Sequence, residues 1–171
     1  GGNTITVSGP LWSALAGHGA GSSLEARVAA LAFAGLVAER RRATAPTPIL
    51  AVVHPFSAHR YQLAYWLAAA GVDPERDVDI VVLPPPLMPE ALAAGEIDGF
   101  CAGEPWGSRA VESCGARILT TNAHIWRASP EKVIGMRRDW AEADVDVAER
   151  VVRAIHRAAQ WCDRPENRSA L

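Results

Sequence analysis

The chain has little lysine, little cysteine and no long apolar run. Its 171 residues include sixteen arginines but a single lysine, Lys132, and the net charge is only -2. This balance provides no basic surface for nucleic acid, so we expect no direct nucleic-acid partner. No apolar run approaches the roughly 20 residues of a membrane-spanning helix. The three cysteines form no CxxC pair, and their odd number argues against a disulfide framework.

The sequence also lacks the common motifs of nucleotide-binding and catalytic sites. It contains no Walker loop, no GxGxxG, no GxSxG and no zinc-ligand spacing. No pair of carboxylates is evidently placed for general acid–base chemistry. We therefore predict a binding protein rather than an enzyme, with no cofactor and no metal.

The amino-terminal stretch GGNTITVSGP has neither the basic start nor the apolar core of a signal peptide. It is typical of a segment from the interior of a protein. We expect the chain to begin and end inside a longer protein, so its termini do not indicate a compartment.

Apolar runs alternate with helical patterns along the chain. The expected strands cover residues 4–8, 49–53, 78–83, 97–101, 117–121 and 131–137. The expected helices cover residues 11–16, 24–42, 58–70, 89–94 and 105–113, with a last helix near the carboxyl terminus. The run at 49–53 is apolar throughout, as in strands covered on both faces, and 78–83 is expected to be buried too. The alternation predicts an α/β fold with a mainly parallel sheet flanked by helices.

Serine and aspartate residues mark the expected helix starts, because their side chains accept hydrogen bonds from free amides. The expected caps are Ser22 or Ser23, Ser57, and Asp144 or Asp146. Three consecutive prolines at 84–86 are expected to be extended, and residues 122–129 to form a turn.

His59 is the first candidate binding residue. It falls in the first helical turn after the buried strand at 49–53. In open α/β sheets, ligands bind at the carboxyl ends of strands, against helix N-termini whose free N–H groups face an anion. The alternative is a solvent-exposed histidine with no ligand. His54, directly after the strand, is assigned a structural role.

The stretch from Ala102 to Trp106 is the second candidate. A strand ends here, Gly103 allows close backbone approach, and Pro105 suits the first position of a helix. Free amides near Gly103 would then donate hydrogen bonds to oxygen atoms of a small ligand, and the Trp106 side chain would form one wall of the pocket. The alternative is an ordinary capped helix whose tryptophan packs in the core.

Lys132 is the third candidate, because it is the only lysine and stands at the start of an expected apolar strand. A compact ammonium there would suit an anion partner. The alternative is a solvated lysine at a sheet edge.

Three blocks carry a resemblance to a known family: HPFSAHRYQLAYWLAAAGVDPERDVDIVVLPPPLM, GEIDGFCAGEPWGSRAV and IWRASPEKVIGMRRDW. They resemble the nitrate- and bicarbonate-binding proteins of ABC importers, which have the type II periplasmic-binding-protein fold. The resemblance runs from about Asn3 to Arg168 and implies a fragment of a two-lobed protein. Residues 1–48 would be an inter-lobe segment and leading helix, 49–125 the second lobe, and 126–171 the return towards the first lobe.

The resemblance also implies roles for single residues. His59 is similar to the family's anion-binding histidine, and Gly103, with Ala102 beside it, to its backbone amide donor. Lys132 matches the lysine that marks nitrate binders, where bicarbonate binders have an acid and use calcium. Glu104 and Trp106 are further candidates for the pocket, with Glu104 orienting the loop or capping a backbone group.

These resemblances imply a solute-binding component of an ABC importer that takes nitrate or nitrite and docks on a transporter permease. A second hypothesis is a cytoplasmic nitrate or nitrite sensor of the same fold that controls an RNA-binding antiterminator, because HPFSAH also resembles that branch. An enzyme that uses Lys132 is the least favoured alternative. The importer would be periplasmic or membrane-associated, the sensor cytoplasmic.

A site built from Lys132, His59 and the Gly103 amide would present hydrogen-bond donors only. Bicarbonate carries a hydroxyl that would find no acceptor there, whereas nitrate accepts hydrogen bonds and donates none. An unsatisfied buried donor costs about 1–3 kcal/mol. We therefore expect nitrate to be preferred, with no dependence on calcium.

Overall fold

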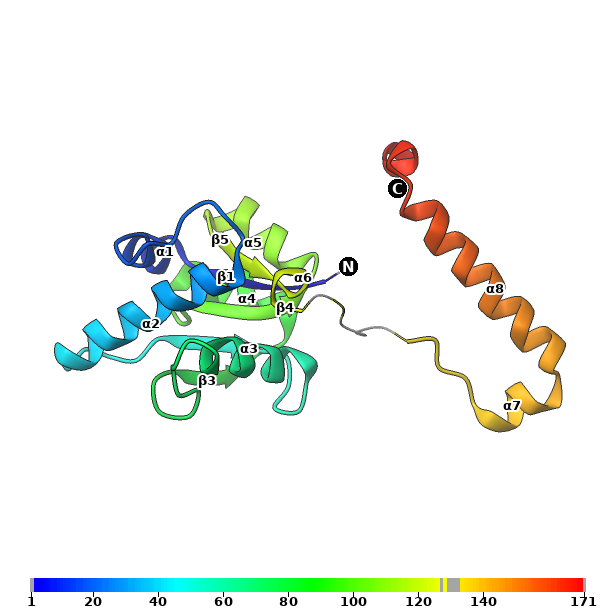
Figure 1. The fold of residues 1–171 in the computed structure, drawn as a ribbon, viewed down its shortest axis with the longest axis horizontal. Coiled ribbons are helices and arrows are strands. Elements are labelled where there is room, and N and C mark those ends of the chain that lie inside the picture. The colour runs from blue at the N-terminus through cyan, green and yellow to red at the C-terminus, as the bar shows by residue number, and fades with distance from the viewer. Residues whose placement is uncertain (1, 127, 129–132, 171) are drawn as a thin grey trace. The chain divides into compact units, whose positions relative to one another are not determined.

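The computed structural model describes residues 2–126, 128 and 133–170 and divides the chain into two units, residues 1–131 and 132–171. The first unit is an α/β structure built on a five-stranded sheet (Figure 1). The second is helical. None of the helices in the described ranges has the length and apolar character that crossing a bilayer requires.

The sheet of the first unit has the strand order β3-β2-β4-β1-β5. Its strands are β1 (Asn3–Val7), β2 (Ile49–Val52), β3 (Asp79–Val82), β4 (Gly99–Gly103) and β5 (Arg117–Thr121). Strand β2 is parallel to β3 and β4, but β1 runs antiparallel to both β4 and β5. The α/β class and the mainly parallel sheet are confirmed: of the described strands, all but β1 run in the same direction, and β1 enters between two later strands in the opposite direction.

Helices cover both faces of this sheet. One face packs against α1 (Gly9–Ala16), α2 (Ala26–Arg42) and α3 (Ala58–Ala68), and the other packs against α4 (Met88–Ala94) and α5 (Trp106–Cys114). Successive side chains along each strand point alternately to the two faces of the sheet, and so into the two hydrophobic cores. Odd-numbered residues of β1 and β4 face α1–α3, and even-numbered residues face α4 and α5. This alternation decides which polar side chains meet at the candidate site.

Several sequence expectations need correction. β3 is not a buried strand, because it lies at the sheet edge and its residues are exposed or half-buried. β4 starts and ends two residues later than expected. The prolines form a short 3-10 helix, Pro85–Leu87, and the expected turn at 122–129 begins with a short helix, α6 (Asn122–Ile125).

Two of the expected helix caps are confirmed and one is wrong. Ser57 accepts a hydrogen bond from the Arg60 amide at 3.3 Å and caps α3. Asp144 accepts one from the Val147 amide at 3.0 Å and caps α8. Neither Ser22 nor Ser23 caps α2, because that helix starts later, at Ala26.

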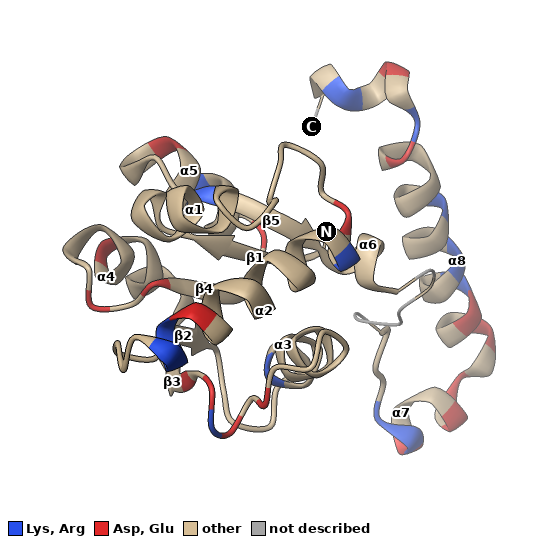
Figure 2. Cartoon of the chain, turned by 60° about the vertical axis from the view of Figure 1, so that its left-hand side comes forward, with Lys and Arg blue, Asp and Glu red and all other residues tan. Residues whose placement is uncertain are grey.

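The second unit contains α7 (Arg138–Ala143), α8 (Val145–Cys162) and a 3-10 helix, Pro165–Ala170. Residues 133–137 form no strand, so that part of the expected strand is wrong, and residues 131 and 132 lie outside the described residues. Arg137 donates two hydrogen bonds to Asp139, which lowers the pKa of the Asp139 carboxyl and raises that of Arg137. Basic and acidic residues both occur along α8 (Figure 2).

Candidate functional site

The candidates His59, Ala102 and Gly103 lie at one end of the sheet, where several strands end. Strands β2, β4 and β5 finish there, and β1 begins there, because β1 runs antiparallel to its neighbours. Helix α3 starts a few residues after β2, so its free N-terminal amides lie at the same end of the unit. This is the position at which α/β sheets bind anionic ligands.

His59 is the second residue of α3. The Ser57 cap fixes the start of the helix and therefore the place of the histidine in its first turn. Both ring nitrogens of His59 are shielded from solvent. The histidine is thus half-buried, with its ring nitrogens inside the protein, and its role as a ligand donor stays a prediction.

Two hydrogen bonds that flank the β1–β4 pairing reveal its pattern. The Ser8 amide donates to the Asp98 carbonyl at 2.9 Å, and the Glu104 amide donates to the Gly2 carbonyl at 3.2 Å. In an antiparallel pair, opposed residues alternate between hydrogen-bonded and non-bonded pairs. Even-numbered residues of β4 therefore form the hydrogen bonds to β1.

The two candidate backbone donors consequently differ. By this alternation the Ala102 amide points towards Thr4 across the β1–β4 ladder, and its role as a ligand donor stays a prediction. The Gly103 amide points to the other side, towards β2. Strand β2 makes its last pairing with β4 at Val52 and Cys101, so Gly103 extends beyond its end. Gly103 is the better placed of the two amides to donate to a ligand.

Gly103 is the point where the site residues converge. An ideal Cβ on Gly103 would lie 3.8 Å from His59 Nε2 and 3.5 Å from Asn3 Oδ1. Residues from β4, α3 and β1, far apart in sequence, thus lie around Gly103. One added atom, such as a methyl carbon or a ligand oxygen, would fit beside Gly103 at ordinary contact distances from both side chains.

Asn3 and Gln62 are polar residues of this site that sequence reasoning missed. Asn3 is 2% exposed and Gln62 is 8% exposed. The Asn3 Nδ2 donates to Gln62 Oε1 at 2.6 Å, and Asn3 Oδ1 is buried with no partner among the described residues. The available signal was a polar side chain on the apolar stripe of α3, since Gln62 adjoins the buried Leu63 and Trp66.

Glu104 and Trp106 lie elsewhere. Glu104 Oε2 accepts a hydrogen bond from the Ser108 amide at 3.1 Å, so the predicted backbone-capping role is confirmed. Its Oε1 lies near Gly107 together with the hydroxyls of Thr4 and Thr6, on the α5 side of the sheet.

Trp106 packs against the core on that same side, with the Arg109 guanidinium 5.8 Å from its ring centroid. Asn3 faces α3, on the opposite side from Thr4. The structure thus places Glu104 and Trp106 on the other side of the sheet from Asn3, and their part in the anion pocket stays a prediction. Pro105 is the N-cap of α5 rather than its first residue.

Lys132 lies outside the described residues, so its place relative to His59 is a prediction from sequence. Within the described ranges, no group of three or more histidine, cysteine, aspartate or glutamate side chains is placed to hold a metal ion.

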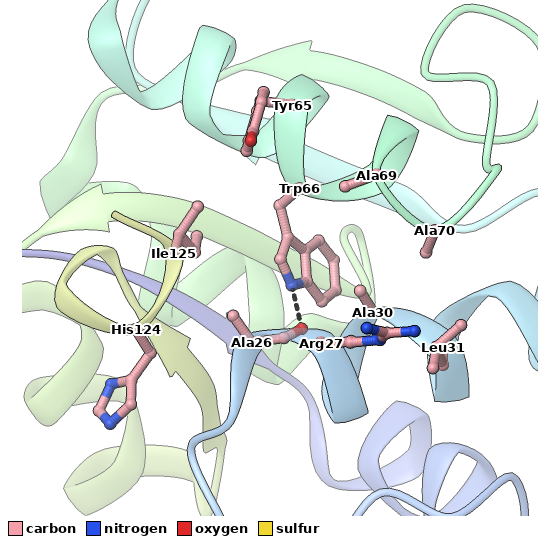
Figure 3. A pocket seen from close by; sticks show the side chains of 10 residues that line it. All are labelled: Ala26, Arg27, Ala30, Leu31, Tyr65, Trp66, Ala69, Ala70, His124 and Ile125. Atoms are coloured by element: carbon pink, nitrogen blue, oxygen red, sulfur yellow. Dashed lines mark hydrogen bonds between the residues drawn. The ribbon is translucent and has the colours of Figure 1, made fainter. Parts of the chain in front are cut away.

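A separate pocket of about 480 Å³ lies between α2, α3 and α6 (Figure 3). Its wall includes Arg27, Tyr65 and His124, and the Trp66 indole N–H donates to the Ala26 carbonyl at 2.8 Å. Of the predicted site residues that the structure describes, none lines it. It is a hollow in the surface of the first unit, distinct from the candidate anion site.

Comparison with known proteins places the chain in a family. All 171 residues match the NMT1-like family, and the chain belongs to it. It is 41% identical over 122 residues to the nitrate import ATP-binding protein NrtC of Synechocystis. It is 37% identical over 123 residues to the nitrate/nitrite binding protein NrtA of Nostoc. It is also 40% identical over 119 residues to the bicarbonate transport ATP-binding protein CmpC of Synechococcus elongatus.

These matches cover 71%, 71% and 70% of this chain. They cover only 18%, 28% and 18% of the relatives, so the chain spans less than a third of each. The resemblance inferred from the three sequence blocks is confirmed.

Solved structures confirm the fold. The crystal structure of the periplasmic nitrate-binding protein NrtA from Synechocystis matches with a TM-score of 0.74 and 28% identity, covering 97% of this chain and 39% of that one. The alkanesulfonate-binding protein SsuA from Xanthomonas axonopodis matches with a TM-score of 0.62 at 19% identity, which shows the fold alone. The family match and the relationship to the binding protein NrtA agree with the prediction of a binding protein rather than an enzyme.

Proposed function

We propose that this chain forms the ligand-holding lobe of a solute-binding component of an ABC importer that takes nitrate or nitrite. The observation that carries the proposal is the convergence of His59 Nε2 and the Asn3 amide on Gly103, at 3.8 and 3.5 Å from its ideal Cβ. The names of the relatives NrtA and NrtC support nitrate as the ligand.

The chemistry of this constellation suits a small planar oxyanion. Nitrate has three oxygens that accept hydrogen bonds and none that donates. His59 would donate from Nε2, Gly103 from its backbone amide and Asn3 from its side-chain amide. The α3 N-terminus and the Lys132 ammonium would balance the single negative charge. A charge-assisted hydrogen bond of this type contributes about 1.5–3 kcal/mol.

Asn3 changes one part of the selectivity argument. A site made of His59, Gly103 and Lys132 would offer donors only, but the Asn3 side chain also carries an acceptor oxygen. The hydroxyl of bicarbonate would therefore find a partner if Oδ1 faced it. Preference for nitrate then depends on how the Asn3 amide is turned.

The sensor remains a second candidate, supported by the HPFSAH block around His54 and His59. In that case the partner would be an antiterminator protein instead of a transporter permease. The two functions differ in what happens after binding. Nitrate-dependent release of an antiterminator from the full-length protein would favour the sensor, and nitrate uptake through a reconstituted permease would favour the importer.

The direct test of anion binding is calorimetric titration of the full-length protein with nitrate and nitrite. His59→Ala is expected to weaken nitrate binding by about ten- to a hundredfold, because it removes one charge-assisted donor. His54→Ala is the matched control. His54 lies in the turn between β2 and α3, its residue is exposed, and its Nδ1 accepts a hydrogen bond from the Phe56 amide at 3.1 Å. A parent protein that binds neither anion, or a folded His59→Ala variant with parental affinity, would overturn the proposal.

A further inference from the structure

The contact between Asn3 and Gln62 joins two side chains that can each donate and accept. Gln62 stands three residues after His59 on α3, so both side chains project from the same face of the helix. The Asn3 Nδ2 to Gln62 Oε1 distance is 2.6 Å, and both residues are almost fully buried. In this arrangement the Asn3 oxygen faces Gly103 and has no partner within the described part of the chain.

An amide pair of this kind has a second arrangement of nearly the same shape. The oxygen and nitrogen of a side-chain amide are similar in size, so both groups can turn over in place. Gln62 then donates to the Asn3 oxygen, and the Asn3 NH₂ group faces Gly103. The first arrangement offers the ligand an acceptor, and the second offers it a donor.

We propose that Gln62 is a positioning residue that supports the Asn3 amide in either arrangement, with its oxygen or its NH₂ group towards the ligand. Through Asn3, it would let the site match an anion that only accepts hydrogen bonds, such as nitrate, or one that carries a hydroxyl, such as bicarbonate, and a residue at 62 that only accepts or only donates would fix one of the two preferences. This inference rests on the proposed anion-binding function of the same site. It assigns to Gln62 an effect on selectivity that a purely structural contact would not have.

Three substitutions separate the two arrangements. In Gln62→Glu the introduced carboxylate only accepts, so Asn3 must donate to it and turn its oxygen to the ligand. In Gln62→Lys the introduced ammonium only donates, so Asn3 must accept and turn its NH₂ to the ligand. Gln62→Met keeps the length of the side chain and removes both functions. Nitrate and bicarbonate carry the same charge, so the ratio of their affinities cancels the electrostatic effect of the new charge.

The measurement is calorimetric titration of the full-length variants with nitrate and with bicarbonate, the weaker ligand being measured by displacement. The preference for nitrate over bicarbonate is expected to fall at least about tenfold in Gln62→Glu relative to Gln62→Lys, with Gln62→Met between them. Equal preference in the Glu and Lys variants would overturn the role of Gln62 while leaving anion binding intact. A parent protein that binds neither anion would overturn the proposed function, and this inference with it.

A measurement on the unmodified protein covers the case in which the charged variants fail to fold. The side-chain amide protons of Gln62 are expected to give different NMR shifts with nitrate and with bicarbonate, because Gln62 donates to Asn3 in one complex and accepts in the other. The same shifts in both complexes would show that the pair does not turn over, and would refute the inference.

Discussion

Replacing Gly103 with alanine is expected to weaken anion binding strongly while leaving the fold intact. The new methyl group would lie 3.5 Å from Asn3 Oδ1 and 3.8 Å from His59 Nε2, which are ordinary contact distances. Gly103 does not have a positive φ, so alanine meets no backbone strain there. Stability should therefore stay within about 1 kcal/mol of the parent, since alanine also restricts the unfolded chain.

The same methyl group would occupy the space in which the proposed site holds a ligand oxygen. It would block the approach to the Gly103 amide and separate the ligand from His59. Loss of one hydrogen bond to a charged ligand costs about 1.5–3 kcal/mol, which corresponds to a ten- to hundredfold weaker affinity for nitrate. Thermal denaturation and calorimetric titration of the full-length protein measure the two effects separately.

Gly107→Ala is the matched control, because it makes the same change on the other face of the sheet. Its Cβ would overlap the Thr4 hydroxyl and lie 2.9 Å from both Glu104 Oε1 and Thr6 Oγ1. Overpacking of this kind costs about 1–3 kcal/mol of stability, while the folded protein should bind nitrate normally. A folded Gly103→Ala variant with parental affinity for nitrate would refute the assignment of the site to this position.

Three further predictions concern charge, core and metal. Lys132→Ala is expected to weaken nitrate binding by about ten- to a hundredfold in calorimetry, because it removes a charge-assisted donor; unchanged affinity would exclude Lys132 from the site. Trp66→Phe is expected to lower the free energy of unfolding in urea by about 1–3 kcal/mol, because the buried Ala26 carbonyl loses its 2.8 Å donor, with nitrate affinity unaffected. Calcium is expected to leave nitrate affinity unchanged in parallel titrations, and calcium-dependent bicarbonate binding would show that Lys132 is misassigned.

Local sequence patterns determined much of this protein. The apolar run at 49–52 forms a buried strand, and Ser57 starts the helix that follows, because a hydroxyl next to free amides caps them wherever the chain allows. Those two features alone place His59 in a first helical turn beyond a strand. Gly103 could also be identified from the sequence alone, because it is the glycine at which strand β4 ends. The family resemblance also depended only on the order of residues along the chain.

Tertiary structure decided which side chains meet. Asn3 and Gly103 lie opposite each other because β1 pairs antiparallel with β4, and no local pattern states that partner or that direction. The same pairing points the Ala102 amide towards Thr4.

Because side chains alternate along the strands, Glu104 and Thr4 lie on the face of the sheet that α5 covers. Asn3 lies on the opposite face, beside Gln62 of α3. A one-residue shift in that register would exchange the two faces. The sequence alone therefore determined the strand and helix ends that carry the site, whereas long-range strand pairing decided which polar groups surround it.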